Sequence, residues 1–575
     1  MKRAQYDIIK TDVLVIGSGG AGLRAAIELH DNNADVLVVG KCAQRDAHTV
    51  LATGGINAAL ATMDSKDGWQ LHAADTLRDG GEINDARAVE ILCKNAPFAV
   101  NELARWGADF HREKNGKITQ RFFGAATYRR ACFVGDQTGR AILHVLVDQV
   151  NKRKVPFHSG IYIFSLLHDK KNTVNGAIGL NIKDGGIVVY HAKAVILATG
   201  GFSRVFARSS SRNFENNGDG IRLAYDVGAS FMDMEMFQFH PTGMVYPKEA
   251  EGVLVTEAVR GEGGVLTNAR GERFMKRYDA ERMELSARDI VARAVYTEVK
   301  EGRGTKNGGV WLDISHKPKS YILKRLPKMY SQFKHYAHVD ISKQKMEVAP
   351  TAHYSMGGVL VDHATGRTTV SRLYAIGEVT SGVHGANRLG GNSLAEIIVY
   401  GRLTGARVAR EVKKMQFLSL DQKQIARRIR ELPLGVKGSN PITEKKALQQ
   451  LMWQHVGVVR RGKDMKKAIR MLDRWKKMRF NCGTSLRRNQ KLIAALDIKG
   501  MIPASEMILR SALFRRESRG AHYRADYRDT LKKWQKNIVC TRTARGIRLA
   551  LRKVMPVPLL LKQYIKKKQY IHHLE

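Results

Sequence analysis

The pattern of apolar and polar residues at the start of the chain predicts a strand, a tight turn and a helix. A short apolar run gives way to Gly17, Gly19 and Gly22, and residues 24–30 continue with helical spacing. A second apolar run, residues 34–39, completes a βαβ unit. In such a unit the glycines permit a sharp turn, close approach of backbone N–H groups to a pyrophosphate, and packing of helix on strand. The pattern predicts a nucleotide at the helix N-terminus.

The residues after the second strand bear on which nucleotide is bound. A standard NAD site has an Asp or Glu there to bind the ribose, whereas this chain has Gly40 and Lys41. The position therefore counts against NAD and leaves FAD or an unusual NADP site open.

Two later apolar runs end in groups that suit the same ligand. Residues 192–201 are typical of a buried strand ending in glycines, and residues 371–379 of a strand ending at Glu378, whose carboxylate suits a ribose or ribityl hydroxyl. Between them, Asp219 opens a helix. We therefore expect one nucleotide-binding sheet built from separate pieces of chain, with residues of about 236 to 350 inserted as another domain.

Length and composition are those of a globular protein with several domains. The chain has 575 residues, 43% of them hydrophobic, with 53 Gly and 12 Pro. No stretch approaches the roughly 18 apolar residues that span a bilayer. The N-terminus lacks the apolar core of a signal peptide. We expect a cytosolic protein, or one peripheral to a membrane.

The chain is strongly basic. It has 96 Lys and Arg against 54 Asp and Glu, a formal net charge of +42 at pH 7. Such an excess suits nucleic acid, an anionic membrane or an acidic partner. The basic runs, such as residues 460–467 and 474–479, lie in helical or tail-like sequence without a recognisable nucleic-acid module. We interpret them as a solvated basic face and expect no nucleic-acid partner.

The cysteines are scattered and form no CxxC pair. They are Cys42, Cys93, Cys132, Cys482 and Cys540. A zinc site or an iron–sulfur cluster needs neighbouring thiolates. We therefore predict no metal site in this chain and place any cluster in a partner.

Five short segments concentrate histidine, arginine and carboxylate side chains next to glycines. These segments are residues 238–243, 256–264, 286–293, 351–358 and 385–394. Each has a structural explanation by itself; His240, for example, precedes a proline and can hold a turn. Together they place two histidines and several arginines near glycine-rich loops, and Arg forks bind carboxylates bidentately. The set predicts a site for a small dianion.

Taken in order, these motifs resemble the flavoprotein subunit of the succinate dehydrogenase and fumarate reductase family. The resemblance extends roughly over residues 10–525, and its last part is the stretch from Phe514 to Tyr527, which is similar to the family's helical domain. The combination is far more specific than the opening glycines alone.

The resemblance implies an α/β fold with a particular domain order. A Rossmann-like FAD-binding domain, residues 1–235 and 350–415, is interrupted by an α+β capping domain, residues 236–349, and followed by a helical domain, residues 416–535. Within the last part, residues 536–575, the stretch 547–568 matches nothing in the family. We expect a basic C-terminal tail, either docked on a partner or an anionic membrane surface or inert.

The resemblance also assigns the FAD contacts. His48 matches the family's histidine that is bonded covalently to the FAD 8α-methyl carbon, a link that raises the flavin potential. The positions matched to the cofactor are Gly17, Gly19, Gly20, Ala21, Gly22, Lys41, His48, Thr49, Gly54, Gly55, Ala198, Thr199, Gly200, Asp219, Glu378, Arg388, Ser393 and Leu394.

A second group of residues matches the family's catalytic machinery. Arg288 matches the residue that exchanges a proton with the substrate, and its pKa above about 12 makes it depend on the relay matched by Glu257 and Arg260. The groups that hold and polarise two carboxylates are matched by His240, Thr256, His353 and Arg388. The resemblance implies hydride transfer between succinate or fumarate and flavin N5.

The chain departs from the family at Thr53, where members often have Gln or Glu. The difference bears on the flavin potential and leaves the direction of the reaction open. The resemblance further implies an iron–sulfur subunit that accepts electrons, membrane anchor subunits and a quinone beyond it. It places the chain in the cytoplasm, peripheral to the inner membrane through those partners.

Three alternatives stand beside this interpretation. L-aspartate oxidase resembles the family, binds FAD without a covalent bond and generally lacks a histidine at position 48. A soluble fumarate reductase would use another electron donor. A basic nucleic-acid-binding protein would bind DNA or RNA in a salt-sensitive way, but it leaves the glycine loops and the dianion constellation unexplained.

Overall fold

The central sheet brings together the pieces of chain that end in candidate ligand-binding turns. In the computed structural model, which describes residues 6–566, β1 (Tyr6–Ile16) pairs in parallel with β2 (Val36–Gly40) and with β9 (Ile187–Leu197). β16 (Leu373–Ala375) pairs in parallel with the end of β9. The carboxyl ends of these strands therefore meet at one edge of the sheet, the usual ligand-binding edge of an α/β fold.

Alternating side chains on β1 fill two separate cores. Val13 and Val15 pack on the side of α1 (Gly20–Asp31), while Leu14 and Ile16 face the opposite side. Both faces of the strand are thus buried, which explains its nearly continuous apolar sequence. The remaining strands of the sheet are β6 (Phe157–Ser159), β7 (Ile161–His168) and β8 (Val174–Asn181), in the order β6-β2-β1-β9-β8-β7.

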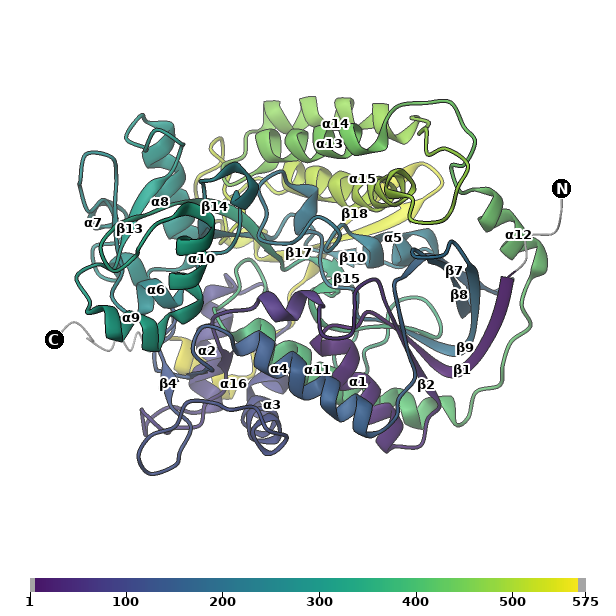
Figure 1. Ribbon diagram of the computed structural model, residues 1–575, viewed down its shortest axis with the longest axis horizontal. Helices are drawn as coiled ribbons and strands as arrows, with labels where there is room; N and C mark the ends of the chain where they lie inside the picture. Colours follow the sequence, from purple (N-terminus) through teal and green to yellow (C-terminus); the bar gives the residue numbers. More distant parts are fainter. Residues whose placement is uncertain (1–5, 567–575) are drawn as a thin grey trace.

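Helices cover the face of the sheet on which α1 lies. α4 (Thr138–Lys152) and α11 (Asn392–Val412) lie beside α1, and α3 (Ala86–Arg105) packs on α11 (Figure 1). α11 begins inside the segment of residues 385–394 singled out in the sequence, so its first turn lies at the edge of the sheet. The small strands β3 (Ile56–Asn57), β4 (Gln120–Arg121) and β5 (Ala131–Cys132) pair with one another.

The inserted segment forms its own sheet and its own hydrophobic core. β11 (Phe237–Met244) and β14 (Met346–Ser355) pair antiparallel, with His240 opposite Thr351. The other elements are β12 (Val265–Thr267), β13 (Val310–Asp313), α6 (Ala258–Gly261), α7 (Met275–Tyr278), α8 (Arg288–Lys300), α9 (Lys319–Arg325) and α10 (Pro327–Ala337). Because β11 and β14 are the first and last elements of the insertion, they carry it on the nucleotide-binding unit. The bounds of the inserted domain, residues 236–349, remain a prediction.

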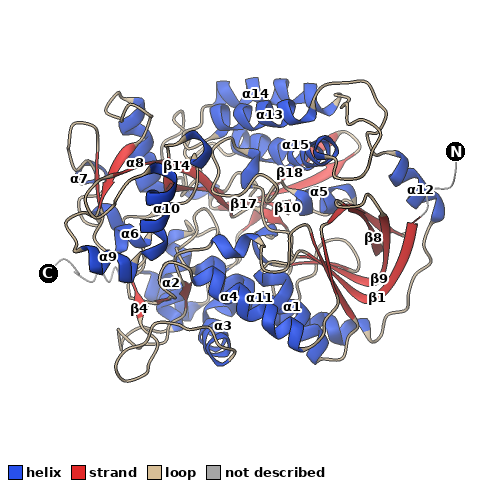
Figure 2. Ribbon diagram, in the orientation of Figure 1, coloured by secondary structure: helices blue, strands red, loops and turns tan. Residues whose placement is uncertain are grey.

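Four helices follow along the chain, and the last three of them lie above the sheet in Figure 1. They are α12 (Gln422–Arg430), α13 (Pro441–Val456), α14 (Gly462–Lys476) and α15 (Gln490–Phe514). α13 and α14 pack on α15, whose Met507 and Ile508 share the core that contains Leu14 and Ile16 of β1. Figure 2 shows this helical layer next to α5 (Asp219–Asp226).

The basic tail predicted from residue 536 is folded instead. β17 (Lys536–Thr543) and β18 (Gly546–Lys553) form a hairpin, and β17 pairs with β10 (Phe231–Met232), which also pairs with β15 (Gly358–Val359). α16 (Leu559–Lys566) packs on α2 (Trp69–Asp79), with Leu561 fully buried. The prediction failed because this segment's dense positive charge masked its strand alternation. Residues 567–575 of the predicted tail lie outside the described residues.

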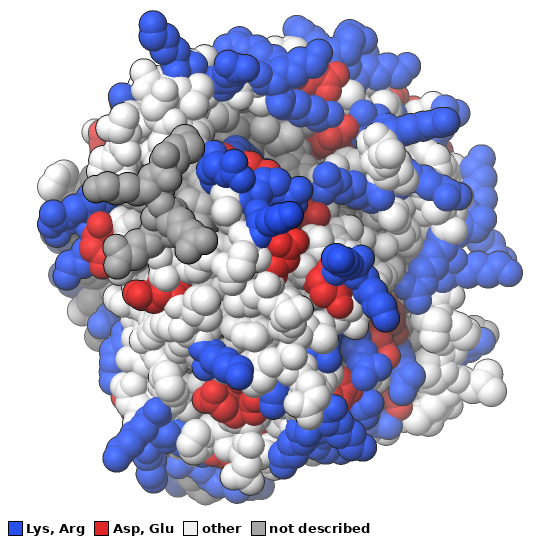
Figure 3. Space-filling model, turned by 90° about the vertical axis from the view of Figure 1, so that its right-hand side faces the viewer, with Lys and Arg blue, Asp and Glu red and all other residues white. Residues whose placement is uncertain are grey.

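Many Lys and Arg side chains lie on the surface of the protein (Figure 3). On the face shown in Figure 3, Lys and Arg are distributed over several elements with a smaller number of Asp and Glu between them. Among the helices of residues 6–566, none is both long enough and apolar enough to cross a bilayer.

Candidate active site

The turn after β1 leaves no room for side chains. Gly17 has φ +118°, and a Cβ atom built there would lie 2.1 Å from the carbonyl oxygen of Ala198. A Cβ at Gly22 would lie 2.0 Å from the carbonyl oxygen of Gly17. Glycine is required at both positions, one for backbone conformation and close approach and the other for helix packing.

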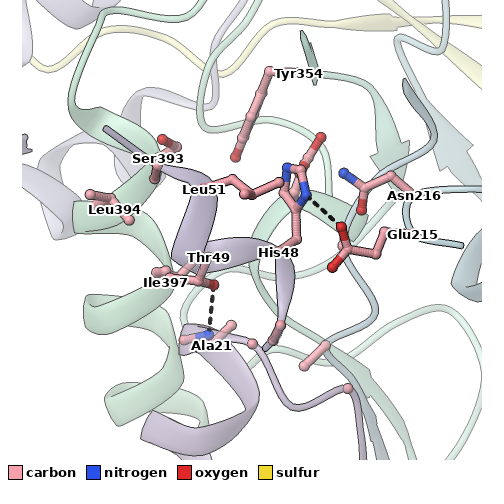
Figure 4. Close-up of a pocket in the computed structure, with 18 of the residues that line it drawn as sticks. Ala21, His48, Thr49, Leu51, Glu215, Asn216, Tyr354, Ser393, Leu394 and Ile397 are labelled. Atoms are coloured by element: carbon pink, nitrogen blue, oxygen red, sulfur yellow. Dashed lines mark hydrogen bonds and ion pairs between the residues drawn. The ribbon is translucent and has the colours of Figure 1, made fainter. Parts of the chain in front are cut away.

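The same turn is tied to the loop that carries His48. Gly19 is the N-cap of α1, and the backbone N–H of Gly20 donates a 3.0 Å hydrogen bond to Oγ1 of Thr49 (Figure 4). Thr49 lies in the short 3₁₀ helix His48–Leu51. This contact fixes the position of His48 relative to the helix N-terminus.

One continuous cavity links the glycine turn to the predicted dianion site. Its walls include Gly17 and Gly19 near one end, His48 and Glu378, and Arg288. The other predicted residues that line it are Gly20, Ala21, Lys41, Thr49, Gly54, Gly55, Ala198, Thr199, Gly200, Asp219, His240, Thr256, Glu257, His353, Arg388, Ser393 and Leu394. Gly22 and Arg260 are outside this lining, the first under the turn and the second behind Glu257. The structure therefore places both predicted groups of residues around one space.

Several polar atoms on the cavity walls are buried without a hydrogen-bond partner among the described residues. They include Oγ1 of Thr53, Oγ1 of Thr199 and Nε of Arg388. A buried polar group without a partner costs free energy. These atoms are thus suited to bind a polar ligand that fills the cavity.

Two carboxylates, Asp219 and Glu378, line the cavity. Lys41 Nζ is 2.6 Å from Oδ2 of Asp219, which begins α5. Glu378 Oε1 accepts hydrogen bonds from the backbone N–H of Ser355 at 3.1 Å and from its hydroxyl at 3.2 Å. Burial raises the pKa of Glu378. Burial lowers the pKa of Lys41, but the charges of Asp219 and Asp497 outweigh it and raise that pKa.

His48 is held by a carboxylate that the sequence motifs did not indicate. Its Nδ1 is 3.2 Å from Oε2 of Glu215, and Glu215 in turn accepts hydrogen bonds from Nε and Nη2 of Arg212 at 2.9 and 2.5 Å (Figure 4). Burial raises the pKa of Glu215, but the hydrogen bonds from His48 and Arg212 outweigh it and lower the pKa to about 2. Burial lowers the pKa of His48, while Glu215 more than compensates and raises it.

Arg288, at the start of α8, lies between the insertion and the nucleotide-binding unit. Its Nε and Nη2 donate to Oε2 of Glu257 at 2.7 and 2.5 Å, and its Nη1 donates to Oε1 of Gln238 at 3.1 Å. Gln238 also donates to the backbone oxygen of Arg388 at 2.8 Å. Gln238 therefore couples the position of Arg288 to the loop that carries Arg388.

Arg260 stands behind this pair. Its Nη2 is 3.8 Å from Oε1 of Glu257, while its Nη1 donates to the backbone oxygen of Glu284. Burial raises the pKa of Glu257, but the charges of Arg288 and Arg260 lower it to about 2. Burial is also the largest cause of a lowered pKa at Arg260. The carboxylate of Glu257 thus lies between Arg288 and Arg260.

Two histidines face each other beside Arg288. The rings of His240 and His353 meet edge to face, 5.2 Å apart, and Ser210 Oγ lies 2.9 Å from Nδ1 of His353. Burial, helped at His240 by the charge of Arg288, lowers the pKa of both histidines well below the usual value. Both are thus neutral at pH 7, each with one N–H donor. Thr256 is fully buried beside them.

Arg388 lines the same cavity as Arg288 and the two histidines. Its guanidinium lies 4.3 Å from the centre of the Tyr354 ring, and its Nη1 donates to the hydroxyl of Ser393 at 3.1 Å. Burial, together with the charge of Arg288, lowers the pKa of Arg388 to about 10, so the group is still a cation at pH 7. The Tyr354 hydroxyl donates to Oε2 of Glu396 at 2.6 Å.

Several residues that hold others in position had no role predicted from the sequence, although Gln238 and Tyr354 lie within the segments singled out there. Ser210, Glu215, Gln238, Tyr354 and Glu396 all contribute contacts described above. Glu215 directly precedes the Asn-Asn-Gly-Asp segment that opens α5, and Gln238 and Tyr354 lie close in sequence to the two histidines. Their closeness in sequence to these motifs is the signal that could have indicated them. No group of three or more His, Cys, Asp or Glu in residues 6–566 is arranged to hold a metal ion.

Comparison with known proteins identifies the class. A family model described as FAD binding domain matches residues 12–394, and one described as fumarate reductase flavoprotein C-term matches residues 445–570. Together with the glycine turn and the cavity, these matches define an FAD-dependent oxidoreductase. The second match includes the hairpin that was predicted to be a tail.

The chain belongs to the flavoprotein subunits of the succinate dehydrogenase and fumarate reductase family. It is 43% identical to a fumarate reductase (CoM/CoB) chain of Methanothermobacter marburgensis, over 94% of this chain and 98% of that protein. It is 36% identical to a succinate dehydrogenase flavoprotein subunit of Rickettsia bellii, over 92% and 93%. The fold matches a chain of Escherichia coli quinol fumarate reductase with a TM-score of 0.89 and 31% identity, covering 96% of this chain and 99% of that one. The predicted family and fold class are confirmed.

Proposed function

We propose that the protein interconverts succinate and fumarate, with Arg288 as the group that exchanges a proton with the substrate. The observation that carries this proposal is the set of Arg288, Arg388 and two neutral histidines at one end of the cavity whose other end is the glycine turn. Two cationic forks and neutral donors suit a small molecule with two carboxylates.

The cavity residues fit FAD. The turn at Gly17 excludes any side chain from the place where a pyrophosphate meets the helix N-terminus, and the hydroxyls of Thr53 and Thr199 are buried and unpaired among the described residues. When bound, FAD supplies a two-electron centre that accepts or donates hydride at N5. Lys41, Asp219 and Glu378 are the polar side chains that would hold its hydroxyl-bearing parts.

Substrate binding places one carboxylate at each side of the cluster. Arg388 and His353 hold one, and His240 and Thr256 hold the other. Donors fixed before the reaction stabilise charge that develops on a carboxylate during hydride transfer. Their positions are set by Ser210 at His353 and by Ser393 at Arg388.

Arg288 moves the proton with help from its neighbours. Arginine loses a proton only at a high pKa, so the carboxylate of Glu257 must take part. Glu257 contacts Arg288 directly and lies next to Arg260, an arginine whose pKa is lowered by burial. A proton passed along Arg260, Glu257 and Arg288 reaches the substrate carbon without crossing bulk water.

His48 is the proposed point of covalent attachment of FAD at its 8α-methyl carbon. The side chain lines the cavity and its position is fixed by Thr49 and Glu215. Covalent attachment distinguishes the proposal from L-aspartate oxidase, which binds FAD without a bond to the protein.

Electrons leave through a partner. Because the described residues hold no cluster of metal ligands, the proposed acceptor is an iron–sulfur protein of the same complex, with membrane anchor subunits and a quinone beyond it. A second candidate exchanges electrons with a CoM/CoB couple in place of a quinone, and it is favoured by the 43% identity to a protein named for that couple.

The test uses the chain purified with its co-purifying subunits. Succinate oxidation is assayed with an artificial acceptor and fumarate reduction with a reduced viologen dye. Arg288→Ala is expected to abolish both reactions while FAD stays bound, whereas Arg293→Ala, an arginine of the same helix outside the cavity, keeps activity. Substantial turnover by Arg288→Ala, or oxidation of L-aspartate by the wild-type protein, contradicts the proposal.

A further inference from the structure

A chain of charged groups runs from the exposed Asp46 to the ring nitrogen of His48. Asp46 and Glu215 both accept hydrogen bonds from Arg212, and Glu215 lies 3.2 Å from His48 Nδ1. The side chain of Glu215 is only 6% exposed. Glu215 comes from the loop before α5, far from His48 in sequence, so the contact is made by the fold and not by a local turn.

This contact selects one tautomer of His48. A neutral imidazole carries its proton on one nitrogen, and the hydrogen bond made by one nitrogen decides the state of the other. A carboxylate at Nδ1 keeps the proton there and leaves the electron pair on Nε2. In Figure 4 one ring nitrogen points to Glu215 and the other lies on the side of the ring away from it. The nearest polar group to Nε2 is Ser211 Oγ at 3.5 Å, too far for a strong hydrogen bond.

The other carboxylate of this region makes its hydrogen bonds to another residue. Glu378 lines the same cavity, but its Oε1 is taken up by the backbone and hydroxyl of Ser355. It influences His48 through its charge and makes no hydrogen bond to the ring among the described contacts. The choice of tautomer therefore depends on Glu215.

We propose that Glu215, anchored by Arg212, is the positioning residue that promotes the attachment of FAD to His48. The proposal rests on the covalent attachment put forward above and names the group that assists it. The arrangement resembles the carboxylate and histidine of a catalytic triad, in which the carboxylate fixes the tautomer and stabilises the imidazolium that forms.

The step balances in atoms and electrons. A C–H bond of the 8α-methyl group breaks, Nε2 of His48 forms a bond to that carbon, and the electron pair of the C–H bond reduces the flavin. The methyl proton and the Nδ1 proton are the two protons that the reduced flavin and solvent take up. Fumarate, a substrate of the proposed function, reoxidises the flavin and becomes succinate. Glu215 stabilises the positive charge on the ring while the Nδ1 proton is still present.

The experiment measures attachment directly. Wild-type protein and variants are produced in a riboflavin-limited host, incubated with FAD, and denatured in acid at intervals. Flavin that stays with the denatured chain is covalent, and absorbance before denaturation gives total bound FAD. Glu215→Gln is expected to attach FAD on the order of 100-fold more slowly while binding it. Glu251→Gln, a carboxylate paired in the same two-bond manner with Arg208, is the matched control and attaches FAD at the wild-type rate.

Rescue separates positioning from structural support. Glu215→Asp keeps a carboxylate and is expected to attach FAD faster than Glu215→Gln. Should Glu215→Gln bind no FAD, Glu215→Asp decides: attachment supports the proposal, and bound but unattached FAD overturns it. Attachment by Glu215→Gln at the wild-type rate overturns the role of Glu215 but leaves covalent attachment standing. A wild-type protein that releases all its flavin in acid overturns both.

Discussion

Arg288 places two of its nitrogens on a single oxygen of Glu257, at 2.7 and 2.5 Å, and leaves the other oxygen to the backbone N–H of Gly124 at 2.8 Å. The carboxylate is thus saturated on both sides and cannot rotate away. A group fixed in this way keeps the guanidinium aimed at one point of the cavity, which is what transfer to a substrate carbon requires.

The first prediction concerns this pair. Glu257→Gln keeps the shape of the side chain but removes the charge that accepts a proton, so kcat is expected to fall by about 100-fold with a much smaller change in KM. Steady-state kinetics of fumarate reduction check it. Glu262→Gln, which pairs with Arg325 at 2.9 Å outside the cavity, is the control. An unchanged kcat in Glu257→Gln removes Glu257 from the relay.

The second prediction concerns the glycine turn. In Gly17→Ala the new methyl group collides with the carbonyl of Ala198, and φ +118° is unfavourable for alanine. The variant is expected to contain little or no FAD. Gly186→Ala, where the nearest atom is Oδ1 of the flexible Asp184 at 3.1 Å, should bind FAD normally. Flavin absorbance per mole of purified protein decides, and full occupancy in Gly17→Ala contradicts the assignment.

The third prediction is that Ser210 affects binding of the substrate and not the chemical step. Its hydroxyl is 2.9 Å from His353 Nδ1 and helps to orient that ring. Loss of one hydrogen bond costs about 1 kcal/mol, so Ser210→Ala is expected to raise KM for the dicarboxylate about fivefold at nearly unchanged kcat. A fall in kcat alone would instead connect Ser210 to the chemical step.

The low pKa of Glu257 predicts how stability changes in acid. Its pKa is about 2 in the folded protein, against 4.5 for an ordinary glutamate, because the charges of Arg288 and Arg260 outweigh burial. The folded-state pKa is depressed, so the stabilisation is present above about pH 4.5 and is lost as the pH falls towards 2. It is on the order of 3 kcal/mol. Denaturant unfolding should show that wild type and Glu257→Gln differ at pH 6 and converge below pH 4.5; a difference independent of pH contradicts this assignment.

The C-terminal hairpin predicts where the chain tolerates truncation. A chain ending at residue 535 loses β17, leaves one edge of β10 uncovered while β15 still pairs with the other, and removes Asn537, whose side chain donates to Asp233 at 2.6 Å. We expect it to be insoluble or unfolded, because an uncovered strand edge favours aggregation. A chain ending at residue 556 keeps the hairpin and should remain folded. Circular dichroism and size-exclusion chromatography distinguish these results.

Local patterns were sufficient for the parts of the fold that are encoded locally. The glycine turn, the apolar strands and the loops around His240 and His353 each carry their signal within about a dozen residues, and the structure brings them to one cavity. Glu215, Gln238 and Tyr354 could not be predicted in the same way, because their roles come from contacts between distant segments. A single carboxylate in a loop has no periodic or spacing signal.

The hairpin shows a different limit. Ile538 and Cys540, two positions apart on β17, are fully buried, whereas Val539 and Thr541 on the other face are half-buried. The surrounding lysines and arginines favoured a solvated tail instead. Charged residues occupy the face of the strand that meets solvent, and apolar residues occupy the face that packs on the core. Burial of the apolar face determines that the segment folds as a strand.

The residues that line the cavity come from distant parts of the sequence, which determines when during synthesis the cavity can form. Gly17 is made early, but the wall opposite it needs Ala198, and the far end needs Arg388 and Ser393. A chain emerging from the ribosome can therefore complete the cofactor site only after about two thirds of its length has been synthesised. β10 pairs with β17, near the end of the chain, so this pairing can form only after translation is almost finished.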